Sequence, residues 1–188
     1  LGTNPSGSTV FEKQPKFSTM KALLINSAHQ YDFSGTGHDL TRMHQGWGRC
    51  SVENVLTQFS ESFIVDQADI LTVGQPKVYT VTVLSGQPEL KITMTYPDPP
   101  GTTSSTQHRI NDLSIKVTSP GGVEYHGNVG LDTSPYSSSG GSHNAIDTVE
   151  NVFIANPEVG DWTIEVSADE INQDGHIDTP AVDAVFSL

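Results

Sequence analysis

The sequence predicts a mainly β protein: a jelly-roll β-sandwich of about eight antiparallel strands, preceded by a small helical segment. Gly, Pro, Ser and Thr are plentiful, while aromatic residues make up only 7% of the chain. This composition favours many short strands joined by turns over a helical bundle. In addition, short stretches of alternating apolar and polar residues recur along 61–188, separated by turn sequences.

Periodicity divides the 188 residues into three regions. Residues 1–17 are polar, contain Gly, Pro and Ser, and show no periodicity, which is typical of a linker or a cut end. Residues 18–60 contain the helical segment, and residues 61–188 contain the predicted strands. We expect two short helices with one tryptophan between them to need a further layer, because they cannot enclose a core by themselves.

The first helix is predicted from Ser18, with Ser18 or Thr19 as its N-cap. The second is predicted to be capped by Ser51, with Glu53 in its first turn. Their apolar faces are formed by Met20, Leu23, Leu24, Ser27 and Ala28 in the first, and by Val52, Val55, Leu56 and Phe59 in the second.

Two strands bracket a long polar loop in the middle of the sandwich region. The first runs from Leu90 to Tyr96, with Lys91, Thr93 and Thr95 predicted to face solvent, and it ends in the sequence PDPPG. The second begins at Asn111 and Asp112. The other predicted strands are Ser62–Gln67, Val78–Leu84, Val123–Tyr125, Val149–Ala155, Trp162–Ser167 and Val182–Leu188.

Charge and cysteine content limit the function classes. The formal net charge of -13 argues against nucleic acid and against anionic membranes as partners, because both need a basic surface. Cys50 is the only cysteine, so no intrachain disulfide can form. No apolar run approaches the roughly 20 residues that span a bilayer, and we therefore expect no membrane span.

Four motifs in one order carry a family resemblance. They are YPDPPG (Tyr96–Gly101), INDLSIKVTSPGG (Ile110–Gly122), YHGN (Tyr125–Asn128) and VENVFI (Val149–Ile154). This series resembles the C-terminal jelly-roll domain of some subtilisin-like serine proteases, a domain similar to the P-domain. The chain departs from that pattern at Tyr96, where the family often has Trp, and at Ser114, where it often has a second Asp.

Upstream, KALLINSA (Lys21–Ala28) and QGWGR (Gln45–Arg49) resemble the closing segment of a subtilisin-like catalytic domain. The resemblance implies that the chain is the C-terminal part of such an endopeptidase, with the jelly roll packed on the catalytic domain of the same polypeptide. It also implies a secreted protein or one of a secretory or lysosome-like compartment. The family's nucleophile, acid and base motifs do not occur in these residues, so we expect no peptidase activity from this chain alone.

The resemblance to calcium-bearing family members also implies a metal site. Hard cations prefer six to eight oxygen ligands, and Asp98, Asn111 and Asp112 lie at the two rims of the long loop. Further ligands for the same ion would be Asn128, Glu150 and Asn151. The alternative is that Asp98 caps the Pro-Pro turn while Asn111 and Asp112 bind loop amides.

A second, weaker calcium candidate is the sequence EINQDGHID. Glu170, Asn172, Asp174 and Asp178 occupy positions 1, 3, 5 and 9 of an EF-hand-type loop, but position 12 is Ala181 instead of the bidentate Glu. The sequence therefore favours an ordinary hairpin turn between the last two strands.

A different class of function is a non-catalytic module that recognises carbohydrate or a protein partner, since jelly rolls also host lectins. Sugar-binding surfaces use exposed aromatic side chains, and the candidates are Tyr31, Tyr125 and Tyr136. Trp162 is excluded because its alternating pattern places it on an inward face.

Overall fold

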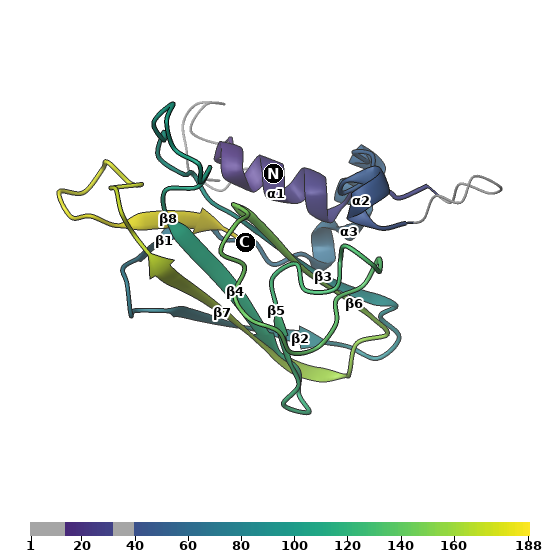
Figure 1. Cartoon of the computed structure of the whole chain (residues 1–188). Helices are drawn as coiled ribbons and strands as arrows, with labels where there is room; N and C mark the ends of the chain where they lie inside the picture. The colour runs from purple at the N-terminus through teal and green to yellow at the C-terminus, as the bar shows by residue number, and fades with distance from the viewer. Residues whose placement is uncertain (1–13, 32–39) are drawn as a thin grey trace.

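The computed structural model describes residues 14–31 and 40–188, so most of the predicted linker, 1–17, lies outside the described residues. A helical segment covers one side of a β-sandwich (Figure 1). Its elements are α1 (Phe17–Asn26), α2 (Arg42–Gln45), α3 (Val52–Gln58) and the 3-10 helix η1 (Phe59–Glu61). The strands are β1 (Asp66–Leu71), β2 (Lys77–Val83), β3 (Glu89–Thr95), β4 (Asp112–Thr118), β5 (Glu124–His126), β6 (Val149–Ala155), β7 (Gly160–Glu170) and β8 (Ala184–Ser187).

The eight strands form two antiparallel sheets of four. One has the order β1-β8-β3-β6 and the other β2-β7-β4-β5. This interleaved order, in which the first and last strands lie side by side, is that of two Greek keys folded into a jelly roll. The predicted fold class is therefore confirmed.

The main hydrophobic cluster of the described residues lies between the two sheets, and its buried members all belong to the strand region. Trp162 and Phe186 are its largest fully buried side chains, and Leu113, Ile115 and Val117 of β4 also belong to it. Burying a side chain of this size contributes about 1.5 to 3 kcal/mol each. Trp162 also donates its indole N–H to the carbonyl of Glu158, so its polar atom is satisfied.

The helix α1 packs on the outer face of the sheet β1-β8-β3-β6, with only part of the predicted face. Of that face, Ser27 and Ala28 are buried just after the end of α1. Its buried residues are Ser18, Thr19 and Ala22, whereas Met20 is exposed. The predicted N-cap was also wrong, because the helix begins at Phe17 and no side chain caps it. The physical reason is that the sheet face beneath is polar, so hydroxyl groups of the helix turn toward it.

Hydrogen bonds hold α1 on this face. Ser18 shares a hydrogen bond with Ser187 of β8, and its carbonyl accepts one from the hydroxyl of Thr95. Thr19 donates to Asp66 of β1, and Asn26 donates to the carbonyl of Lys91 in β3. The prediction that Thr93 and Thr95 face solvent was wrong for the same reason: both are buried, at 4% and 0% exposure, because α1 covers them.

The helix α3 keeps its apolar face open. Its Ser51 cap is confirmed, since the hydroxyl accepts a hydrogen bond from the backbone N–H of Asn54. Val52 and Leu56 are 68% and 65% exposed, and Phe59 of η1 is 45% exposed. Val55 of the predicted apolar face is partly buried, but within the described residues the other three side chains of that face stay exposed.

Two strand predictions were wrong in detail. The first strand runs from Asp66 to Leu71, whereas the predicted strand was Ser62–Gln67, and the positive φ of Gln67 lies at the shift in its register with β8. The last two strands do not form a hairpin. β7 and β8 belong to different sheets, so the connection between them crosses the end of the sandwich. None of the helices in the described ranges is long and apolar enough to cross a membrane.

Candidate functional site

The residues of the first predicted calcium site surround the end of the sandwich where the β3–β4 loop leaves and returns. The two carboxylate oxygens of Asp98 accept hydrogen bonds from the backbone N–H groups of Ile110 and Asn111, both at 2.8 Å. Asp98 therefore closes the base of the loop by binding amides at its far end, whereas the alternative to metal binding predicts that Asp98 caps the Pro-Pro turn.

Asn111 is completely buried and joins this loop to the β7–β8 connection. Its side-chain oxygen accepts from the backbone N–H groups of Asn172 and Gln173, at 2.9 and 3.1 Å, and its amide nitrogen donates to the carbonyl of Gln173 at 2.9 Å. Both the side-chain oxygen and the amide nitrogen of Asn111 are therefore bound by backbone groups of the β7–β8 connection. The two calcium candidates, predicted separately, are thus parts of one network.

Arg109 is a member of this network that the sequence analysis missed. Its guanidinium is 2.9 Å from Asp112 and 3.0 Å from Glu170, and it donates to the carbonyl of Ala145. The side chains of Arg109 and Asp112 are only 7% and 6% exposed. The signal that could have found this pair is the i, i+3 spacing of opposite charges just before β4.

Glu150 lies at the edge of the core and is fully buried. One carboxyl oxygen accepts the backbone N–H of Ile115 at 2.8 Å, at the point where β5 has ended and β4 has a free edge. Burial raises the pKa of Glu150 to about 8, and the nearby Asp112 carboxylate adds to the rise. A carboxyl group of this kind is uncharged over much of the neutral range.

Three buried oxygen atoms of this region have no hydrogen-bond partner among the described residues. They belong to Asp112, Ser114 and Glu150. Burial also raises the pKa of Asp112, although the Arg109 charge opposes this effect. A proton on Glu150 could supply one of the missing hydrogen bonds, since a protonated carboxyl is a donor.

Asn128 and Asn151 close the edge of β6 and do not point to the same place as Glu150. Asn128 exchanges hydrogen bonds with the backbone of Asn151 and donates to the carbonyl of Val149. The Asn151 side chain instead accepts from Thr93, on the face of the sheet that α1 covers. Adjacent strand residues face opposite sides of a sheet, so Glu150 and Asn151 cannot share an ion.

The YHGN motif has a steric reason that follows from this arrangement. A Cβ atom on Gly127 would lie 2.0 Å from the carboxyl oxygen of Glu150, so only glycine lets the chain pass over the buried carboxyl group. The next residue, Asn128, has a φ of 65°, a left-handed conformation that asparagine tolerates better than most residues. These two residues of the motif therefore let the backbone lie close against Glu150 at the closed edge between the sheets.

The second calcium candidate, Glu170–Asp178, is held as a loop by the same network. Glu170 pairs with Arg109, and its pKa is lowered first by the hydrogen bond with Asn172 and then by the interaction with Arg109. Asp174 accepts the backbone N–H of His176 at 3.0 Å, which is an Asx turn. The side chain of Asp178 is 82% exposed and lies 3.6 Å from His176.

Within residues 14–31 and 40–188, no three His, Cys, Asp or Glu side chains are grouped so that they could hold a metal ion. The six predicted ligands of the first site are divided among three places: the base of the loop (Asp98, Asn111), the buried region near Arg109 (Asp112, Glu150) and the edge of β6 (Asn128, Asn151). Calcium binding stays a prediction, and only the buried region retains unpartnered carboxyl oxygens among these six.

The three predicted aromatic residues for carbohydrate binding do not share one surface feature. Tyr125 packs against the core residue Trp162, with ring centroids 6.1 Å apart. Arg49 covers the ring of Tyr31, with its guanidinium carbon 4.8 Å from the ring centroid. Tyr136 donates its hydroxyl to Glu89 at 2.6 Å, and this hydrogen bond raises its pKa to about 12.

Tyr136 also lines a small cavity beneath α1, together with Trp47 and Phe153. Its volume of about 30 Å³ corresponds to roughly one water molecule. A sugar ring does not fit in this space.

Comparison with known proteins adds no assignment. No protein-family model matches the chain, and no match was found among curated proteins.

Proposed function

We propose that this chain is the C-terminal part of a subtilisin-like serine endopeptidase, in which the jelly roll packs on the catalytic domain and stabilises it. The proposal rests on the resemblance of the ordered motifs from Lys21 to Ile154. A secreted protease, or one of a secretory or lysosome-like compartment, is part of the same proposal.

The observation that carries the proposal is the open apolar face of α3 and η1. Val52, Leu56 and Phe59, with Phe63 just beyond them, are between 45% and 68% exposed. A row of large apolar side chains at helical spacing normally packs against a neighbouring layer. We assign the catalytic domain as that layer.

The motifs themselves support a stabilising role. Their charged and amide residues bind backbone groups: Asp98 at the base of the loop, Glu150 at the edge of β4, and Asn128 at the edge of β6. Polar groups used in this way fix the shape of the sandwich. They are not arranged as a nucleophile, base and orienting group.

The test compares the isolated chain with the same chain extended by its natural upstream sequence. The pure isolated chain is expected to hydrolyse no chromogenic peptide, whereas the extended protein should do so. Leu56→Glu should leave the Tm of the isolated chain nearly unchanged, because the side chain is exposed, but it should lower the temperature at which the extended enzyme loses activity. Val159→Glu, at a residue 62% exposed between β6 and β7, is the control and should change neither.

Two results would overturn the proposal. One is an upstream sequence that confers no peptidase activity. The other is an equal effect of Leu56→Glu and Val159→Glu on the extended enzyme, since the α3 face would then have no special role in stabilising it.

A further inference from the structure

The guanidinium of Arg109 is surrounded by oxygen acceptors that come from three separate parts of the chain. Asp112 at the start of β4 contributes a carboxylate at 2.9 Å, and Glu170 at the end of β7 contributes another at 3.0 Å. The third acceptor is the carbonyl of Ala145, in the long β5–β6 connection. Arg109 itself belongs to the β3–β4 loop, so one side chain joins four segments.

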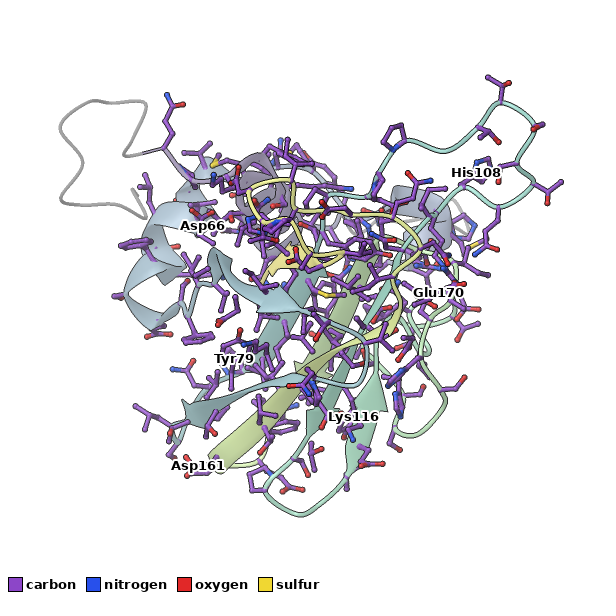
Figure 2. All side chains as sticks on the ribbon, turned by 90° about the vertical axis from the view of Figure 1, so that its left-hand side faces the viewer. Asp66, Tyr79, His108, Lys116, Asp161 and Glu170 are labelled. Carbon is purple, nitrogen blue, oxygen red and sulfur yellow. The ribbon has the colours of Figure 1, made fainter. Side chains whose placement is uncertain are left out.

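Figure 2 shows where this junction lies. His108 is on a loop that stands off the body of the domain, and Glu170 lies at the end of the sandwich below it. Residues 101–108 are all exposed, while the next residue, Arg109, is buried. The loop therefore becomes fixed at Arg109, where it returns to the sandwich.

Two carboxylates and a peptide carbonyl are the kinds of ligand that a calcium ion would take between loops. A guanidinium can serve the same acceptors, because it carries a permanent positive charge and directs five N–H donors in a plane. We propose that the guanidinium of Arg109 is the cation that holds this junction together, because it binds the carboxylates and the carbonyl that a calcium ion would otherwise bind.

The neighbouring residues support this assignment. A calcium ion bound by Asp98 or Asn111 would displace hydrogen bonds from the backbone N–H groups of Ile110, Asn111, Asn172 and Gln173, which would then be unpaired. An ion bound by Asp112 would lie beside the Arg109 charge, which is already 2.9 Å from that carboxylate. The proposal does not depend on the protease assignment.

The test measures the Tm of the isolated chain and of the variant Arg109→Met. Removing one partner of a buried ion pair is strongly destabilising, so the variant should lose about 6 to 20 °C. Arg42→Met is the matched control, because Arg42 pairs with Asp147 at 3.2 Å with both side chains partly exposed. It should lose no more than about 4 °C.

The second arm adds calcium to the wild-type chain. Calcium at about 5 mM, which would saturate even weak extracellular sites, should leave the Tm within about 1 °C of its value in chelator. Asp112→Asn in the Arg109→Met background should restore part of the lost Tm, because it removes the unpaired buried carboxylate. If Arg109→Met does not fold, Arg109→Lys replaces it: a lysine keeps the charge but cannot reach all three acceptors, so it should lower the Tm more than Arg42→Lys does.

Two outcomes overturn the proposal. One is a rise of several degrees in the wild-type Tm with calcium that magnesium does not reproduce, which would show that a metal ion stabilises the junction. The other is a loss at Arg109 no larger than the loss at Arg42.

Discussion

Among the single residues, Glu150 uses its side-chain carboxyl group to bind an edge of β4 that no neighbouring strand in the described part of the chain covers. It accepts the N–H of Ile115 beyond the end of β5, and it is fully buried. Its second oxygen has no partner among the described residues. The alternating pattern of β6 places residue 150 inward, but no sequence pattern reveals that its carboxyl group completes the edge of another sheet.

Glu150 should make the stability of the domain depend on pH. Its pKa in the folded state is about 8, against an ordinary value of 4.5, so the folded state favours the protonated form. The stabilisation is complete below about pH 4.5 and is lost as the pH rises through about 8. Glu150→Gln, which is always neutral, should therefore gain on the order of 4 kcal/mol relative to wild type between pH 5 and pH 9.

Urea unfolding at the two pH values measures this difference. Glu158→Gln, at an exposed turn, is the control and should follow the wild type. A constant offset between Glu150→Gln and wild type at both pH values would contradict the assignment of the pH dependence to this residue.

Gly127→Ala should destabilise the domain strongly. The added Cβ would lie 2.0 Å from a carboxyl oxygen of Glu150 and 2.7 Å from its Cβ, so the chain or the buried side chain must move. We expect a loss of at least about 2 kcal/mol in chemical denaturation. Gly101→Ala is the comparison, since its Cβ would meet Ile110 at an ordinary 3.4 Å; equal losses for the two alanines would contradict the steric explanation.

At the scale of elements, α1 is held on its sheet by polar groups. Thr19 is 1% exposed and donates to Asp66, and its hydroxyl lies 2.8 Å from that of Ser187. Thr95 and Thr93 lie on the same covered face. The helix thus closes one side of the jelly roll with hydroxyl and amide contacts.

Thr19→Val tests this contact, because valine keeps the shape of threonine but removes the hydroxyl. It removes the hydrogen bond to the Asp66 carboxylate and the contact with the Ser187 hydroxyl, which should cost about 1 to 3 kcal/mol. Thr57→Val, at an exposed position of α3, should stay within about 0.5 kcal/mol of the wild type. The Tm of each variant is the measurement, and matching values would show that the α1 hydroxyls add nothing.

Particular residues show how far the sequence could predict these elements. Period-2 alternation found β4, and a near-continuous apolar run placed Val149–Ala155 correctly, because apolar residues that face the core mark a strand directly. Period-2 alternation was less reliable on the covered sheet face. It failed at Thr93 and Thr95, since hydroxyl residues beneath a helix look like solvent-facing ones. It also failed to find Arg109, whose three acceptors are separated from it by up to 61 residues along the chain. The sequence did show that oxygen-bearing side chains gather at the strand ends. It does not show which of these oxygens already accept hydrogen bonds from backbone N–H groups.

At the scale of the whole molecule, the core is made by the strand region alone. All members of the main hydrophobic cluster lie between Val65 and Phe186. The helical segment contributes contacts on the outside of one sheet and carries the exposed face of α3. The two regions are thus joined by an interface of a different character from the core.

A shorter chain of residues 62–188 is therefore expected to fold as a β protein with cooperative thermal unfolding. Its Tm should be lower than that of the full chain, because the hydrogen bonds of Ser18, Thr19 and Asn26 are lost. Circular dichroism and calorimetry check both points. Broad, non-cooperative melting would show that the helices belong to the folding unit.

The polar contact beneath α1 affects which surface the sheet would expose if the helix separated from it. The sheet surface so uncovered would present hydroxyl groups and a carboxamide, which water can wet, beside the apolar side chains of Phe153 and Val185, which are 6% and 2% exposed and lie outside the core cluster. Separation of the helical segment from the sandwich would therefore exchange protein hydrogen bonds for hydration and would also expose apolar surface to water, which ties the two regions together.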